Sequence, residues 1–466
     1  MKHEITFEIN TKIFEMSVRS AMSLRRLCPQ LGALRRNSMQ TLKYDHSSGT
    51  LEDVKQMIQD QLGVEPGYHT VPKCREGLLK YHPKPEELPE RSMKDSFTSA
   101  TLLLGSDPLV RERFVQVTGY VRIGRIMEEL DVFAVWICHR HIHLPNLPKG
   151  IPLPYTFLTL LVDQAKFLQS QFDTNVDVDL SGHVSYTGRS SIEITMYVRQ
   201  SGKLLSKAIF VMVARNAVNS APAPINKLVP GNEQEERIHK EALERHNKRQ
   251  KIRAQPESKV PPSEEEVKIL YNIFQRTRSS KGDLEAPELP EDCRWMSDTR
   301  RDCTIHPFPE NRNNSNTIGG GFTIRRALET SFIAASLFCG APAMVSFLSD
   351  VTFERPIRVN SFITMSAYVV YTHENYLQTM VTVTAIDAET GTRIHCNALY
   401  LTYVCANKMK EVMPKSYHEG LWNLRGRRQF RRFIKSAKLE DYDKDSPPSD
   451  DTKPDTKPCK CGDGKK

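Results

Sequence analysis

The sequence contains no apolar stretch long enough to cross a membrane. No uninterrupted apolar run exceeds seven residues, and Val132–Cys138 is one of that length, whereas a membrane-spanning helix needs about 20. Cysteine is sparse as well, with ten residues spread over 466 instead of the dense spacing of a small secreted disulfide scaffold. These absences exclude a membrane-spanning helical protein. They predict a soluble protein whose cysteines are free thiols in a reducing compartment.

Acidic residues are missing from one basic segment. Met16–Lys43 carries six basic residues, several serines and no acid, which is the composition of a mitochondrial transit peptide. Three glutamates stand among the first fifteen residues, and such signals avoid them. We therefore hypothesise that translation starts at Met16 or Met22, or that the first residues come from a misassigned exon. A disordered basic arm is the alternative. The expectation is a transit segment at residues 1–45 and location in the mitochondrial matrix.

The second half of the chain repeats the first. Val184–Val198 (VSYTGRSSIEITMYV) is matched 185 positions later by Val369–Val383 (VVYTHENYLQTMVTV), with the apolar alternation in phase. The strand-like segments that begin at Ala208 and Ala398 also correspond. A repeat present only twice indicates two copies of one domain and not a solenoid. Catalytic residues of such a protein are expected at the seam, which is the interface between the two copies.

Each copy combines one helix with a meander of strands. The first copy predicts a helix at Ile123–Ile137. Alternating apolar residues and Gly-containing turns then predict four strands, at Phe157–Phe167, Val176–Tyr186, Ile192–Arg199 and Leu204–Arg215. The apolar stripe of the helix is most simply buried against its own sheet. The fold class is therefore α+β, with two tandem domains in which a sheet wraps a central helix, and we expect the two sheets to pair edge to edge.

The remaining segments flank or join the two copies. Capping-box spacing predicts two solvated helices in the charged linker, and the low hydrophobic content of the C-terminal segment predicts disorder. The expected divisions are a helical N-terminal region at 46–91, the first copy at 92–219, the linker at 220–290, the second copy with a C-terminal extension at 291–433, and a disordered tail at 434–466.

Asp131 is the exception on an apolar helix face. It shares that face with Met127, Ala134 and Cys138 by helical spacing. A carboxylate there costs several kcal/mol unless it is hydrogen-bonded or its pKa rises, and such groups gather at active sites. The alternative is that Asp131 caps a backbone turn or lies at the edge of the stripe. In the second copy Glu329 stands nearly at the same place, where a surface ion pair with the preceding arginines is the preferred interpretation.

The second copy has a polar loop that leads into a glycine-rich helix start. The loop His306–Ile318 is followed by Gly319, Gly320 and Gly321. The first N–H groups of a helix have no partner within it, and the helix dipole is positive at that end. Such a start suits a developing oxyanion, although three glycines before a helix are also common in plain turns. Asparagines able to orient a water stand just upstream, at Asn311, Asn313, Asn314 and Asn316.

These segments together resemble one known family. The chain is similar to the double-hotdog acyl-coenzyme A thioesterases, of the mitochondrial thioesterase 9 type, over roughly Ser92–Phe433. The resemblance implies hydrolysis of fatty acyl-CoA to fatty acid and CoA without a cofactor, in mitochondrial fatty acid metabolism, and assembly of double-hotdog units into a homo-oligomer. The segments that carry it are Ser92–Pro108, Val121–His139, Val178–Tyr186, Phe210–Arg215, Gly320–Glu329, Pro414–Tyr417 and Gly426–Phe430.

The resemblance also implies a composite site between the domains. In the family an acid on one central helix works with an asparagine seven residues before the Gly-Gly of the partner domain, and these positions fall on Asp131 and Asn313. Asp131 would activate water, or less favourably attack directly, while the N–H groups of Gly320 and Gly321 bind the oxyanion. Asn314 is a substitute for Asn313, as is Asn311, because the loop is slightly longer than the family pattern. The reciprocal site, with Glu329, is expected to be degenerate.

Departures from the family pattern at Gly319 and Ser349 leave one alternative of another class. That alternative is a non-catalytic acyl-CoA-binding or protein-interaction paralogue of the same fold. A hydratase would need an Asp and His pair on one loop and helix, and Asp131 has no such histidine nearby.

Metal and nucleic-acid binding are not expected. The alternating His139, His141 and His143 lack further ligands at a fixed spacing and are interpreted as exposed residues after a helix. Cys459 and Cys461 offer two thiolates where a structural zinc site needs four ligands. The arginines of Arg425–Arg432 lack interleaved stacking aromatics, which favours a solvated face or a contact with CoA.

Overall fold

The computed structural model describes residues 42, 44–64, 74–167, 172–254, 260–279, 286–313, 317–353 and 355–437. Nearly all of the predicted transit segment, Asn314, the Cys459 and Cys461 pair and the tail after residue 437 lie outside these ranges. Within them, no helix is both long and apolar enough to cross a membrane.

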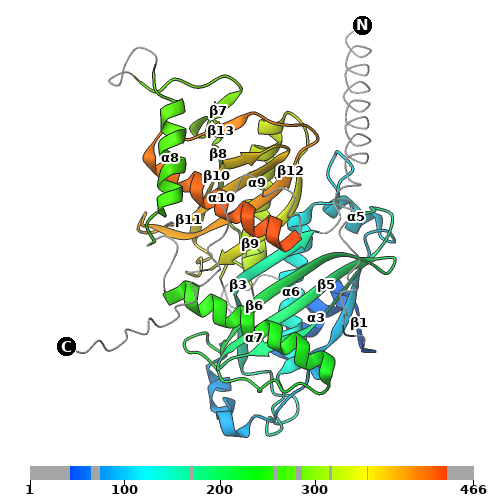
Figure 1. The fold of residues 1–466 in the computed structure, drawn as a ribbon. Coiled ribbons are helices and arrows are strands. Elements are labelled where there is room, and N and C mark those ends of the chain that lie inside the picture. The colour runs from blue at the N-terminus through cyan, green and yellow to red at the C-terminus, as the bar shows by residue number, and fades with distance from the viewer. Residues whose placement is uncertain are drawn as a thin grey trace, which may run out of the picture.

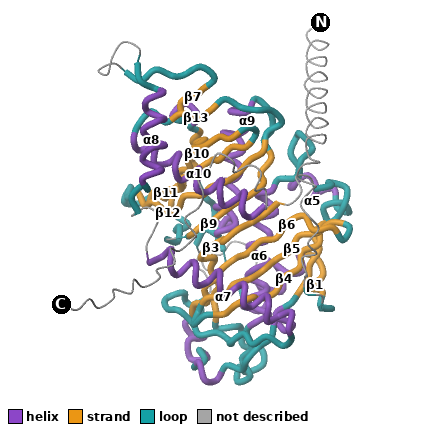
Figure 2. Tube along the Cα trace, viewed as in Figure 1, coloured by secondary structure: helices purple, strands orange, loops and turns teal. Residues whose placement is uncertain are grey.

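One sheet runs through both halves of the described chain (Figures 1 and 2). Its 11 strands have the order β1-β2-β4-β5-β6-β3-β9-β12-β11-β10-β8. The strands of the first half are β1 Ser47–Thr50, β2 Thr98–Leu102, β3 Tyr155–Phe167, β4 Val178–Thr187, β5 Ser191–Gln200 and β6 Lys203–Asn216. Those of the second half are β8 Arg301–Ile305, β9 Met344–Thr352, β10 Ser361–His373, β11 Tyr376–Asp387 and β12 Arg393–Val404. All neighbours are antiparallel except β1 and β2.

The two halves meet at the middle of this sheet. β3 of the first half pairs with β9 of the second, with Leu161 opposite Thr352 and Lys166 opposite Phe347. The two hydrophobic cores form one continuous cluster of buried side chains. The expected edge-to-edge pairing of the two sheets is therefore confirmed, and with it the α+β fold of two tandem hotdog domains.

A central helix lies against each half of the sheet. α6 spans Ile123–His141 and α9 spans Gly320–Cys339. Both are rich in apolar residues that become fully buried, such as Phe133 and Ile137 on α6 and Ile324 and Ala335 on α9. The two helices also pack against each other across the seam between the halves. This contact places the start of each helix beside the body of the other.

The outer faces of the sheet are covered by two further helices. Tyr403 of β12 bonds to Ser331 of α9, whereas the next residue, Val404, packs with Phe430 of α10 (Tyr417–Ala437). Because successive side chains of a strand point to opposite faces, α9 and α10 lie on opposite sides of the second half. α7 (Glu233–Ala254) covers the first half in the same way (Figure 1).

The linker contains the two expected helices, α7 and α8 (Glu264–Arg276). Most side chains of α7 are exposed, as its charge suggested, but its inner face is attached to the sheet. Its Arg245 and Arg249 bind the carboxylate of Glu193, which is only 1% exposed on β5. A buried carboxylate needs such partners, so the charges of α7 serve to attach it to the sheet.

Smaller elements complete the two ends of the structure. In the N-terminal region α3 (Leu51–Leu62) packs its apolar stripe against α6, and the Trp136 indole donates a hydrogen bond of 2.8 Å to Ser48 of β1. The other elements are η1 Glu76–Tyr81, η2 Pro85–Glu87, α4 Met93–Ser96, α5 Pro108–Phe114, β7 Cys293–Trp295, η4 Ser297–Thr299, η5 Pro309–Asn311 and β13 Glu411–Met413. β7 and β13 form a separate two-stranded sheet.

Two sequence predictions about side chains are wrong. The first central helix continues beyond Ile137, so His139 and His141 lie on it and are buried, bonded to Gln61 and to the carbonyl of Asn226. Cysteine is not uniformly free either. Cys339, at the end of α9, forms a disulfide with Cys405, directly after β12, because the fold places the ends of these two elements together.

Candidate active site

The first turn of α9 lies directly against α6. A Cβ atom added to Gly321 would stand 2.7 Å from the Cβ of Asp131 and 3.0 Å from the Cα of Glu128. Added to Gly320, it would stand 3.0 Å from the Cβ of Thr159 on β3. Only glycine permits this approach, because contacts this short require neighbouring atoms to move. The glycines therefore bring backbone of the second domain onto side chains of the first.

Asp131 is held at this seam by both domains. Its Oδ2 accepts a hydrogen bond of 2.9 Å from the N–H of Gly321, and its Oδ1 accepts one from the hydroxyl of Thr159. The sequence alternative that Asp131 caps a backbone turn is partly realised, since the carboxylate does bind a helix start. That start belongs to the other domain, however, so the contact assembles the seam instead of finishing a local turn.

The surroundings of Asp131 raise the pKa of its carboxyl group. The main cause is burial, which disfavours the charged form, and the negative charge of Glu128 acts in the same direction. The hydrogen bonds from Thr159 and Gly321 oppose the shift because they stabilise the carboxylate. The result is a positioned carboxylate with an increased affinity for a proton, which is the property of a general base.

Asn313 lies at the same end of α9. Its side-chain Nδ2 donates to the hydroxyl of Thr317 over 2.9 Å, and its Oδ1 accepts from the N–H of Thr317 over 3.1 Å. A Cβ atom added to Gly319 would stand 4.0 Å from the Cβ of Asn313. The loop thus folds back on itself and fixes the amide beside the glycines. Gly320 is the first residue of α9, and its N–H has no acceptor within the helix.

The two central helices are related by an approximate two-fold axis. Gly321 packs on Glu128, and Gly124 packs on Arg325, where an added Cβ would stand 3.0 Å from the carbonyl oxygen. Glu128 is four residues after Gly124, and Arg325 is four residues after Gly321, so the two contacts have the same spacing. Glu128 and Arg325 form an ion pair of 3.3 Å. Gly124 and Gly321 are therefore equivalent, and the counterpart of Asp131 is seven residues after Gly321.

That counterpart is Leu328 and not Glu329. Glu329 forms ion pairs with Arg326, at 3.2 Å, and with Arg122 of the first domain. The expected local ion pair is confirmed. The placement of Glu329 opposite Asp131 is wrong by one residue, because the packing of the two glycines, and not the 185-residue spacing of the strands, sets the register of the two helices.

Thr159 is the site residue that the sequence did not reveal. It stands inside a strand that could be predicted, but a single threonine in a strand gives no sign that it bonds to an acid on a helix. An alignment of the two copies offers one hint, because Val345 occupies the matching position of β9. Across β6, Thr159 is level with Ile192 of β5. Across β12, Val345 is level with Leu377 of β11. Ile192 and Leu377 are 185 positions apart, which is the spacing of the strand repeat.

The arginines of Arg425–Arg432 lie away from this seam, on α10. Arg428 forms an ion pair of 2.6 Å with Glu266 of α8, and Arg427 lies over the ring of Tyr371. These contacts attach α8 and the outer face of the second half to α10. They do not support the expected contact with CoA or a fully solvated face.

No family model matches the chain, but full-length relatives do. Acyl-coenzyme A thioesterase 9 of Mus musculus mitochondria is 30% identical over 403 residues, which cover 84% of this chain and 91% of that protein. Mitochondrial acyl-coenzyme A thioesterase 10 of the same organism is 31% identical over 376 residues, which cover 79% and 85%. Among solved structures, an acyl-CoA hydrolase from Bacillus cereus matches 32% of this chain and 96% of its own, at 20% identity and a TM-score of 0.29.

Proposed function

Because the chain belongs to the acyl-coenzyme A thioesterase family, we propose that it hydrolyses acyl-CoA at the seam that carries Asp131. The chain is a thioester hydrolase, and its products are the free acid and CoA. The observation that supports the location is the contact of Asp131 with the Gly321 N–H. It brings a carboxylate of one domain to the positive end of a helix of the other, which is the pairing of base and oxyanion site that acyl transfer to water requires.

In the proposed mechanism Asp131 is the general base. A water molecule transfers a proton to the carboxylate while its oxygen attacks the thioester carbonyl carbon. The carbonyl electrons move to oxygen, and the resulting oxyanion is stabilised by the N–H of Gly320 and by the dipole of α9. Collapse of this intermediate breaks the C–S bond, and the CoA thiolate takes up the proton held by Asp131. The acid and CoA leave, and Asp131 is again a carboxylate.

Three neighbours support this role. Thr159 and the N–H of Gly321 hold the two oxygens of Asp131, so the N–H of Gly321 positions the base, whereas the sequence assigned it to the oxyanion. Asn313, fixed beside Gly319 by Thr317, orients the water or the thioester carbonyl. Asn314, the substitute for this role, lies outside the described residues.

The proposal is tested by Asp131→Asn in a thioester hydrolysis assay. Removal of a positioned base costs about 10²–10⁴-fold in rate, so kcat falls by at least about two orders of magnitude while thermal unfolding changes little. Asp60→Asn, which neutralises an exposed aspartate on α3, is the matched control and keeps full activity. Release of CoA thiol is followed with acyl-CoA substrates of several chain lengths. Near-normal turnover by Asp131→Asn removes this residue from the mechanism, and a wild-type chain that binds but never hydrolyses favours the non-catalytic alternative.

We also propose that the protein works in the mitochondrial matrix, in fatty acid metabolism. The relatives reported above are named as mitochondrial, and the basic, acid-free segment Met16–Lys43 has the composition of a transit peptide. Sequencing the mature N-terminus from isolated mitochondria tests this. A protein that begins after Lys43 supports import with cleavage, and one that still carries the segment contradicts it.

The domain divisions and the assembly remain proposals as well. We propose hotdog domains at 92–219 and 291–433 joined by the linker 220–290, and association of the double-hotdog chains into a homo-oligomer. Light scattering of the purified protein distinguishes a monomer from a multiple of the chain mass.

A further inference from the structure

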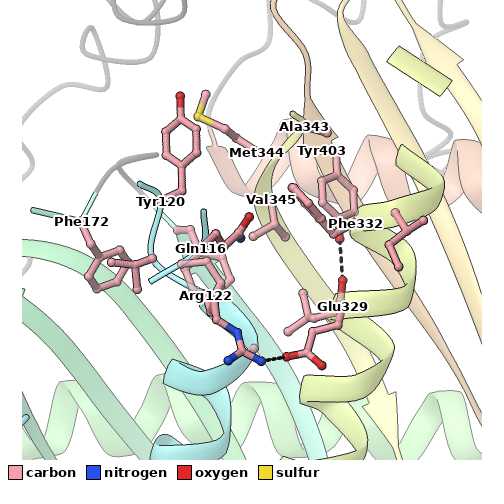
Figure 3. Close-up of a pocket in the computed structure, with 16 residues that line it drawn as sticks. Gln116, Tyr120, Arg122, Phe172, Glu329, Phe332, Ala343, Met344, Val345 and Tyr403 are labelled. Carbon is pink, nitrogen blue, oxygen red and sulfur yellow. Dashed lines mark hydrogen bonds and ion pairs between the residues drawn. The ribbon is translucent and has the colours of Figure 1, made fainter. Parts of the chain in front are cut away.

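The second seam between the domains contains a cavity of about 300 Å³ (Figure 3). It lies at the start of α6, where Gly124 packs on α9, and both domains line it. Gln116, Arg122 and Phe172 come from the first domain, whereas Phe332 and Met344 come from the second. The volume is at the lower end of the range of natural ligand pockets.

This cavity is the counterpart of the Asp131 seam, with its polar groups replaced. By the equivalence of Gly124 and Gly321, Leu328 stands in place of Asp131, and Gln116, eight residues before Gly124, stands in place of Asn313. The strand register places Val345 where the first seam has Thr159. Leu328, Gln116 and Val345 all line the cavity. The second seam thus keeps the backbone arrangement of the first. The positions of the base and of the hydroxyl that binds it are taken by the apolar residues Leu328 and Val345.

The carboxylate nearest to this cavity does not replace the missing base. Glu329 faces the cavity but is held by Arg122 from the first domain (Figure 3). Arg326 of its own helix forms a second ion pair with it. The hydroxyl of Tyr403 is also occupied, by Ser331 and by the carbonyl of Leu328. Glu329 and the hydroxyl of Tyr403 are therefore already bonded to other protein groups, and most of the remaining lining is aliphatic or aromatic.

We propose that the second seam binds the acyl chain of an acyl-CoA without hydrolysing it. This inference rests on the proposed function, because acyl-CoA is the substrate of the equivalent seam. An apolar cavity of this kind accepts a linear hydrocarbon chain by burial of apolar surface. The uncharged thioester then lies at the start of α6, as the reacting thioester lies at the start of α9, and the CoA group remains outside. A free fatty acid fits less well because its carboxylate would have to compete with Glu329 for Arg122.

The occupant is tested by counting binding sites with a probe that cannot be cleaved. S-(2-oxodecyl)-coenzyme A has a carbonyl but no thioester, so its binding does not depend on turnover. Equilibrium dialysis of the full-length chain is expected to give two equivalents of probe per chain. Val345→Trp, which fills the cavity, is expected to give one. Val267→Trp, the same change on the exposed face of α8, is the matched control and is expected to give two.

The possible outcomes are distinct. One equivalent in both wild type and Val345→Trp, or two in both, overturns the inference. Displacement of the second equivalent by decanoate at equal concentration also overturns it, because the site then takes the free acid. One equivalent in wild type and none in Val345→Trp keeps binding at this seam and refutes the location of the proposed active site. If Val345→Trp does not fold, Ile333→Trp at the half-exposed rim fills the same opening and the same outcomes apply.

Discussion

Replacement of Gly321 by alanine separates the structural role of the seam from its catalytic role. The new Cβ would lie 2.7 Å from the Cβ of Asp131 and 3.1 Å from its Oδ2, so the carboxylate has to move. Overpacking of this kind costs about 1–3 kcal/mol, and alanine regains about 1 kcal/mol of helix propensity over glycine. The net loss of stability is therefore at most about 2 kcal/mol. A shift of a reacting group by about 1 Å can cost about 10²-fold in rate.

We thus expect Gly321→Ala to lose about two orders of magnitude in kcat while it remains folded at the assay temperature. Urea unfolding measures the stability, and release of CoA thiol measures the activity of the same preparation. Gly77→Ala is the control, since a Cβ at Gly77 meets no atom within 4 Å and neither quantity should change. A Gly321→Ala protein with wild-type kcat would show that close contact of α9 with Asp131 is not needed for catalysis.

Two further predictions concern protons. Thr159→Val removes a hydrogen bond that lowers the pKa of Asp131, so the acidic limb of the kcat/KM profile should move to higher pH, and an unmoved limb would exclude Asp131 as the titrating base. Burial lowers the pKa of His139 to about 3 and those of His141 and His183 to about 4, whereas an unfolded histidine titrates near 6.5. Below about pH 6.5 the unfolded chain therefore binds protons that the folded chain does not, and stability should fall by up to about 1.4 kcal/mol per pH unit for each histidine down to about pH 4. Urea unfolding at pH 7.5, 6.5 and 5.5 checks this, and equal stability at the three values would contradict the buried neutral state.

The elements of the fold could be predicted because apolar periodicity is local. The four strands of the first copy were placed within two residues of β3, β4, β5 and β6. Asp131 could be recognised for the same reason, since one carboxylate interrupts an otherwise apolar helix face. The pairing of the two sheets followed from the repeat. In each case the sequence signal lies within one element or recurs at one fixed spacing.

The contacts between elements could not be predicted in the same way. The strands repeat at 185 positions, but Gly124 and Gly321 are 197 apart. The strand repeat therefore gives no register for the two central helices, and it could not show that Leu328, and not Glu329, is the counterpart of Asp131. The arginines of α7 are attached to the sheet through Glu193, a carboxylate that is far away in the sequence and becomes buried only when β5 joins the sheet. Such partners are chosen by tertiary packing, which the residue types of a single segment do not encode.

The pairing of β3 with β9 has a consequence for how the enzyme can move. These two strands carry Thr159 and Val345, one for each seam, and they are bonded to each other along one antiparallel ladder. The domains therefore cannot part like a clamshell without breaking that ladder. A motion that opens either seam for reactants or products therefore has to leave β3 and β9 paired.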